Sequence, residues 1–277
     1  MATMTAENLA RLIALGGRVD LSGKDLHRLS LLGATLHSVI FRKANLTRIG
    51  ATDADFTGSD LTEATLDRAQ LEGATLSETT LMGASLKGAN LDRAVLHFAD
   101  LGGADFEDAD LSGSFLVWCT ASRAKFAKAN LGVAKAMESA FIRADFHGAD
   151  LTDADVSSSI FSHADFTGAR LDFVFAPRAT FANVQAHDAR MRNGRFMKCS
   201  FDAADLTAAD FTQAFLDDAS LRGAKLPRAT LSEASLRGAD LTGCDLEGAV
   251  LVGARYDART IWPEGFDPVA AGAVLDP

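Results

Sequence analysis

The side chains of this 277-residue chain that could do chemistry are three cysteines, six histidines and a long series of aspartates. Cysteine thiolates and histidine rings bind metals, and thiolates also carry redox and nucleophilic chemistry. Pairs of carboxyl groups act as general acids and bases. Each of these activities requires the fold to bring the groups together, so the elements that position them come next.

Apolar residues recur every five positions, and this period determines which side chains face the interior. Steps of five from Leu21 to Tyr256 meet 48 positions, and 40 of them are Leu or Phe. Two residues before each position lies a smaller residue, which is Ala at 32 of the 48 places. Helices repeat their side chains every 3.6 residues and strands every 2, so neither alone explains a period of five. The pattern predicts a chain that turns after every pentad.

The pentads ANLDR (residues 89–93) and ADLTG (residues 239–243) are typical of the series. They resemble the A(D/N)LXX motif of the pentapeptide-repeat family, and the resemblance covers residues 19–258. It implies an all-β fold, a right-handed quadrilateral parallel β-helix with four pentads to a coil, so that 48 pentads make about 12 coils. Residues 20 apart would then stack about 4.8 Å from each other in neighbouring coils.

Phenylalanines support the 20-residue coil independently of the family motif. Two series recur at this spacing in the inward phase, and they predict two ladders of rings on adjacent inner faces. These series are Phe106, Phe126, Phe146 and Phe166, and Phe141, Phe161, Phe181 and Phe201.

Both ends of the repeat region need covers, because a terminal coil exposes its core and unpaired backbone. We expect a short N-terminal helical cap over residues 1–18, the β-helix over 19–258 and a C-terminal cap over 259–277. In the last segment Ile261 and Phe266 keep the inward phase, while Trp262 breaks the motif. Asp267 followed by Pro268 predicts the start of a final helix.

This arrangement separates the groups that could do chemistry. Cys119, Cys199 and Cys244 all occupy the small inward slot, which predicts buried thiols that replace Ala. Cys119 and Cys199 would lie four coils apart, roughly 19 Å, which is beyond the reach of a disulfide. The histidines fall at outward positions with no metal-ligand spacing, and the aspartates recur so often that they are better explained as turn-stabilising side chains. The sequence therefore predicts no enzyme, no cofactor and no metal.

The formal net charge is −10, which disfavours direct nucleic-acid binding because phosphates are neutralised by basic surfaces. The first residues lack the basic start and apolar run of a signal peptide, and no run approaches a membrane span. We expect a soluble, cytoplasmic protein.

Outward apolar residues collect on one face of the expected coil, and they form the first candidate surface. Such a patch indicates either an interface or side chains that cover a thin part of the wall. The candidate interaction residues are Phe98, Phe115, Val117, Trp118, Met137, Phe175 and Phe215.

Charge is banded along the chain, and this gives the second candidate surface. Residues 51–115 carry 13 acidic and three basic side chains, whereas residues 161–200 carry three acidic and six basic ones. This basic waist could dock an acidic partner or serve solubility. Its members are Arg170, Arg178, Arg190, Arg192, Arg195 and Lys198.

These surfaces predict a non-catalytic scaffold for protein–protein interaction, an acidic rod with an apolar side face. The partner would be another protein or a second copy of the chain. The alternative comes from the resemblance: some members of the family mimic DNA in width and charge, bind type II topoisomerases and protect gyrase from its poisons. The unbroken frame and the basic waist of this chain depart from that pattern.

Overall fold

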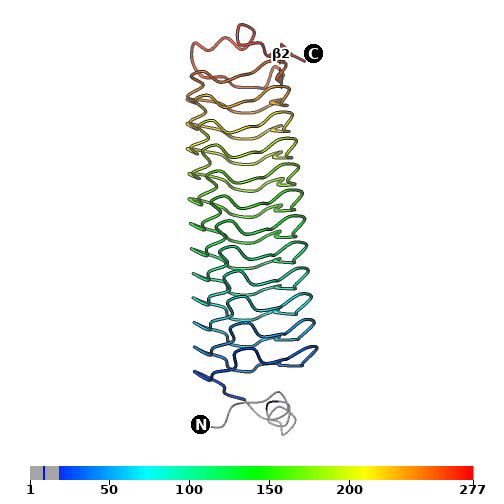
Figure 1. Ribbon diagram of the computed structural model, residues 1–277. Coiled ribbons are helices and arrows are strands. Elements are labelled where there is room, and N and C mark those ends of the chain that lie inside the picture. Colours follow the sequence, from blue (N-terminus) through cyan, green and yellow to red (C-terminus); the bar gives the residue numbers. More distant parts are fainter. Residues whose placement is uncertain (1–8, 10–18, 277) are drawn as a thin grey trace. The chain divides into compact units, whose positions relative to one another are not determined.

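The computed structural model describes residue 9 and residues 19–276, which fall into two compact units. Unit 1 is Met1–Ser139 and unit 2 is Ala140–Pro277. Within each unit the chain forms successive stacked coils (Figure 1). The division at residue 139 falls inside the predicted repeat region, and the predicted segments 1–18, 19–258 and 259–277 stay a prediction.

Within each unit, single parallel bridges join one coil to the next, between positions 20 apart. The first bridge of unit 1 pairs Asp20 with Ile40, and unit 2 repeats the same spacing from Ala140 onward. In most pentads the amide of the inward residue donates to the carbonyl 19 positions later, as Leu46 N does to Thr65 O at 2.7 Å. Four pentads therefore make one coil, which confirms the parallel β-helix. The right-handed sense and the total of about 12 coils stay predictions from the resemblance.

Tight turns separate the pentads. The amide of the small residue closes most turns by donating to the carbonyl three positions earlier, as Ala44 N does to Phe41 O at 2.9 Å. The third residue of the turn has a positive φ, which is typical of type II turns and suits glycine. Many of these positions hold polar residues, such as Arg48 with φ of 58°, but Trp118 also has φ of 58°. A bulky side chain is strained there, so its presence needs a separate explanation.

The predicted phenylalanine ladders form within each unit. In unit 1 the rings of Phe106 and Phe126 stack with centroids 5.0 Å apart. In unit 2 the ladder that begins at Phe141 continues through one ring of each following coil, at centroid separations of 5.0, 5.1 and 4.9 Å. Rings of neighbouring columns meet edge to face, as Phe146 and Phe161 do at 5.7 Å. All these rings are buried, so the ladders are the core of each unit.

Two short strands close the C-terminal end, where the prediction needs correction. β1 (Arg255–Tyr256) pairs in parallel with β2 (Val274–Leu275), so the chain returns to its last coil (Figure 1). The helix predicted to begin at Asp267 is wrong, because residues 268–272 form a turn instead. Gly272, with φ of 88°, ends this turn and packs closely against Val252. Pairing of β2 with β1 satisfies backbone groups that a free helix would have left open.

A frame shift follows β1, and it corrects the expected phase of the tail. Asp240 bridges to Ile261, whereas the regular spacing would pair it with Thr260, so the coil has gained an extra residue. Ile261 was expected to face inward but is 50% exposed. The rings of Trp262 and Tyr256 meet at 5.4 Å, and those of Trp262 and Phe266 at 5.3 Å. An aromatic cluster therefore packs at this end.

The N-terminal helical cap predicted for residues 1–18 lies outside the described residues, apart from Leu9, which is buried. In the part of the chain that is described, no helix has the length and apolar character needed to cross a membrane.

Candidate functional site

The three cysteines are buried in the small inward slot, as predicted. Each thiol donates to a carbonyl of the preceding coil, as Cys119 Sγ does to Leu96 O at 2.9 Å, and Cys199 and Cys244 repeat this bond at 2.8 Å. Burial raises the pKa of each thiol to about 12. Because the thiolate is the reactive form, these groups are inert at neutral pH. They act as small core residues with one extra hydrogen bond.

The aspartates stabilise turns, as the sequence predicted. The carboxylate accepts the backbone N–H two positions later, as Asp55 does from Thr57 at 2.9 Å. Partial burial of Asp60 by itself raises its pKa, but hydrogen bonds from Thr62 and Arg42 outweigh this and hold the pKa below its usual value. These carboxylates are ionised and occupied by their own turns, so they do not form acid–base pairs.

Among the described residues, no group of three or more His, Cys, Asp or Glu side chains could hold a metal ion. His97 and His187 are half-buried, whereas the other four histidines are exposed. The ring of His97 is half-buried, its Nδ1 has no hydrogen-bond partner, and its centroid lies 6.0 Å from that of Phe115. It is part of the wall beneath an aromatic side chain.

The aromatic patch of unit 1 consists of Phe98, Phe115 and Trp118. The rings of Phe98 and Trp118 stack at 4.9 Å with an interplanar angle of 15°, as the 20-residue coil predicts. They are 57% and 49% exposed, and both residues have a positive φ. Trp118 Nε1 donates to Glu138 Oε2 at 3.0 Å, which holds the indole in place. A flat apolar surface is thus presented to solvent in a fixed orientation.

Two neighbours of this patch do not take the place that the sequence predicted. Val117 is buried and is not part of the exposed surface, and Met137 is half-buried. Both residues hold the second turn position beside the patch, so they cover the wall from outside. This corresponds to the second alternative, in which some outward apolar side chains complete the packing of a thin wall.

The aromatic hollow of unit 2 has a volume of about 470 Å³. Phe175 bridges to Arg195, and Arg195 bridges to Phe215, so the arginine lies between two aromatic residues in one column. Arg195 has no ion-pair partner among the residues described. The hollow therefore combines apolar walls with a free positive charge. Its lining residues are Asp153, Phe173, Phe175, Asn193, Arg195 and Phe215.

Three of the six cations of the predicted basic waist are not neutralised by a carboxylate of the described residues. Arg178, Arg195 and Lys198 have no ion-pair partner in the described part of the chain. The other three residues are neutralised by carboxylates, which leaves less positive charge than the sequence count suggested. These ion pairs join Arg170 to Asp150 at 3.4 Å, Arg190 to Asp172 at 2.6 Å and Arg192 to Asp210 at 2.5 Å.

Comparison with known families agrees with the coil geometry. A family model described as pentapeptide repeats matches in eight copies, over residues 52–88, 89–127, 116–157, 159–196, 199–238 and 216–253. The chain belongs to the pentapeptide-repeat family. No curated protein matches this pentapeptide-repeat chain.

Several solved pentapeptide-repeat structures are similar to it. HetL from the cyanobacterium Nostoc sp. strain PCC 7120, involved in heterocyst differentiation regulation, is 25% identical, with 95% of this chain and 99% of that chain covered and a TM-score of 0.38. A thylakoid-lumen protein from Arabidopsis thaliana is 32% identical over 35% of this chain and 64% of that chain, with a TM-score of 0.28. QnrB1, a plasmid-mediated fluoroquinolone resistance protein, is 14% identical, with coverages of 94% and 92% and a TM-score of 0.33. At these TM-scores the structures add no argument about function.

Three residues of the aromatic hollow, Asp153, Phe173 and Asn193, were absent from the predicted surfaces. Phe173 and Asn193 occupy the third turn position in neighbouring coils, in the same column as Asp153, with φ of 58°, 56° and 58°. The sequence signal was their spacing of one coil, which places this column beside the one that contains Phe175. A grouping of outward residues by apolarity alone leaves out the polar Asn193 and Asp153.

Proposed function

We propose that this pentapeptide-repeat protein is a non-catalytic scaffold that binds another protein, or a second copy of itself, through the aromatic patch of unit 1. The exposed stack of Phe98 on Trp118 carries this proposal. A non-glycine residue held at positive φ costs on the order of 1–3 kcal/mol. Exposed rings at two such positions gain nothing from core burial, whereas a partner that covers them removes apolar surface from water.

The patch also has the properties of an interaction anchor. Trp is enriched among the residues that contribute most to binding free energy, and a pre-ordered side chain loses less entropy on binding. The bond from Trp118 Nε1 to Glu138 satisfies the polar atom of the ring without hiding its face. The aromatic hollow of unit 2 supports a second contact, one that suits an apolar segment bearing a carboxylate near Arg195. A cytoplasmic location remains part of the proposal.

The test is a double charge substitution, Phe98→Glu with Trp118→Glu, in the full chain. We expect a folded protein that has lost self-association in light scattering or has lost its partner in a pull-down from native lysate. Val133→Glu is the matched control, because Val133 is also exposed, lies in unit 1 and has φ of 53°. The alternative is end-to-end association through the last coil and the aromatic cluster of Trp262 and Phe266. A double variant that keeps both its wild-type mass and its partners would refute the patch and favour this alternative.

A second candidate, binding of a type II topoisomerase by DNA mimicry, is favoured only by the net charge of −10. Part of the acidic band of unit 1 is neutralised, since Lys87 pairs with Glu107 and Arg93 with Glu72. Salt separates the two candidates. Binding to purified gyrase that weakens steeply as salt rises would support mimicry, whereas association through the aromatic patch should change little.

A further inference from the structure

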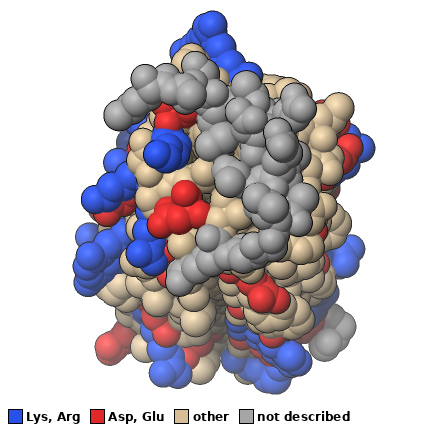
Figure 2. All heavy atoms as spheres, turned by 90° about the horizontal axis from the view of Figure 1, so that it is seen from below, with Lys and Arg blue, Asp and Glu red and all other residues tan. Residues whose placement is uncertain are grey.

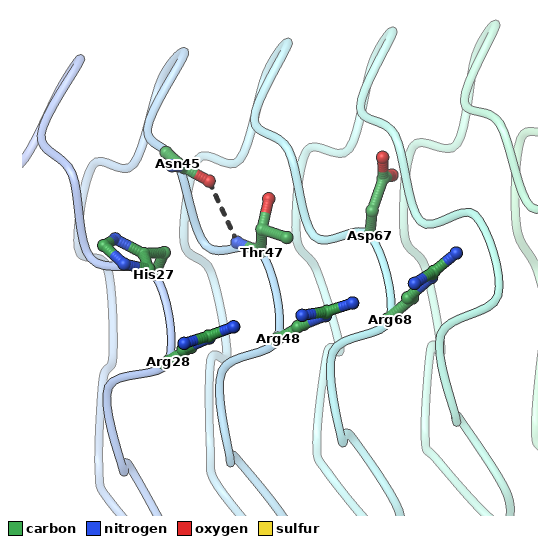
Figure 3. Close-up of a pocket in the computed structure, with 7 residues that line it drawn as sticks. All are labelled: His27, Arg28, Asn45, Thr47, Arg48, Asp67 and Arg68. Atoms are coloured by element: carbon green, nitrogen blue, oxygen red, sulfur yellow. Dashed lines mark hydrogen bonds between the residues drawn. The ribbon is translucent and has the colours of Figure 1, made fainter.

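Three arginines of unit 1 form a column that none of the surfaces above includes. Arg28, Arg48 and Arg68 occupy the third turn position of three successive coils and have φ of 58°, 58° and 56°. We call them the arginine ladder. All three side chains are exposed, and Figure 3 shows them pointing the same way, each from its own coil toward the next. No other column of the sequence has basic residues in three consecutive coils.

The ladder carries charge that nothing in the described part of the chain neutralises. None of the three guanidinium groups has an ion-pair partner there. The nearest carboxylates are used elsewhere: Asp67 accepts from Ser85 Oγ and Lys87 N, and Asp25 accepts from Asn45 Nδ2 at 2.8 Å. Like charges repeated at a coil spacing of about 4.8 Å repel one another. An anion that lies along the column would remove this repulsion.

The ladder borders a hollow of about 530 Å³ that is lined only by polar and charged residues. The backbone N–H of Thr47 donates to Asn45 Oδ1 at 3.1 Å, which fixes the amide (Figure 3). The hydroxyl of Thr47 makes no hydrogen bond within the described residues, so it is a free donor beside the guanidinium groups. The lining residues are His27, Arg28, Asn45, Thr47, Arg48, Asp67 and Arg68. A site with three guanidinium groups, further donors and no apolar residue in its lining suits a small, strongly charged anion.

We propose that the arginine ladder binds a short chain of linked phosphates. The planar guanidinium fork matches the oxygens of a phosphate group, and charge-assisted bonds of this kind are the strong ones. One phosphate can face two neighbouring arginines at most, whereas the ladder extends over two coil spacings, about 10 Å.

The same observations disfavour a long nucleic acid. Single-stranded nucleic acids bind where bases stack on aromatic side chains, and no aromatic residue other than His27 lines this hollow. Beyond Arg68 the column continues with Gly88 and Asp108, so a longer polyanion would meet acidic coils. Seen from below, Lys and Arg side chains are spread around the edge of the face, with Asp and Glu among them (Figure 2). The positive region is local, as a short ligand requires.

Calorimetric titration of the full chain with inorganic tripolyphosphate at low salt tests the proposal. We expect saturable binding that weakens as salt rises and falls about tenfold or more in Arg48→Gln, which removes the middle guanidinium. Arg228→Gln is the matched control. Arg228 has φ of 58°, its stem lies over Gly248 as that of Arg68 lies over Gly88, and it has no stacked cation beside it. Its binding constant should equal that of the wild type.

Further measurements show whether binding needs the guanidinium group or only a positive charge, and whether it needs linked phosphates or accepts any anion. Arg48→Lys should bind more weakly than the wild type, because it keeps the charge and loses the fork. Orthophosphate and citrate at equal ionic strength should bind far more weakly than tripolyphosphate. The proposal is wrong if tripolyphosphate does not bind, or if Arg228→Gln weakens its binding as much as Arg48→Gln does. It is also wrong if a single-stranded RNA without a terminal phosphate binds more tightly than tripolyphosphate. None of these results depends on the aromatic patch, so the proposed scaffold function stands or falls separately.

Discussion

Two aromatic columns of this protein have the same geometry and opposite surroundings. In the core of unit 2, Phe141 and Phe161 stack at 5.0 Å, and on the wall of unit 1, Phe98 and Trp118 stack at 4.9 Å. The core rings are 1% exposed, whereas Phe98 is 57% exposed. The coil repeat alone thus brings rings of successive coils to stacking distance. The position within the pentad decides whether the stack stabilises the fold or remains available to a partner.

The largest test of this comparison removes a core ring. Phe146→Ala deletes a buried ring that contacts Phe141, Phe161 and Phe166, and it should cost about 3–5 kcal/mol of unfolding free energy. Asp145→Ala removes only the acceptor of one turn amide and should cost about 1 kcal/mol. Urea denaturation of both variants measures the difference. Equal losses would mean that the inward phase has been assigned wrongly.

The corresponding change on the wall should have a smaller effect on stability. Trp118→Ala loses one ring stack, worth about 0.5–1.5 kcal/mol, and relieves part of the strain of a bulky residue at positive φ. We therefore expect a net change of less than about 1 kcal/mol in the same denaturation experiment, together with loss of association. A loss as large as that of Phe146→Ala would place Trp118 in the structural core and weaken the proposed function.

The smallest effect concerns the turns that connect both kinds of column. The pKa of Asp60 is lower in the folded state than in the unfolded state, so the folded state binds fewer protons at this carboxyl group. The contribution of Asp60 to folding stability is therefore present above the unfolded pKa, and it is lost as the pH falls through the lower folded pKa. Stability should therefore decline as pH drops below about 4. Asp60→Asn should reduce this decline by about 0.5 kcal/mol, measured by urea denaturation at pH 7 and pH 3. An unchanged pH profile would show that the Thr62 and Arg42 bonds contribute nothing.

Much of the fold could be predicted from the sequence because the repeat is strict. Every inward position was assigned from period five, and the 20-residue coil then predicted both the phenylalanine ladders and the stack of Phe98 on Trp118. The buried thiols and the turn-stabilising aspartates followed from the same phase. A strict five-residue period in the sequence determines whether a side chain points inward or outward, independently of which residues surround it.

Features that do not repeat were decided only by the tertiary structure. Val117 occupies an outward position but is buried, with 7% of its surface exposed. The extra residue before Ile261 and the pairing of β2 with β1 replaced a predicted helix, since an end coil has one unpaired edge that only a returning strand can satisfy. Three arginines of the basic waist form ion pairs with carboxylates, whereas the arginine ladder forms none within the described residues. Ion pairing depends on whether charged side chains of neighbouring coils can reach each other. The order of residue types in the sequence does not give these distances.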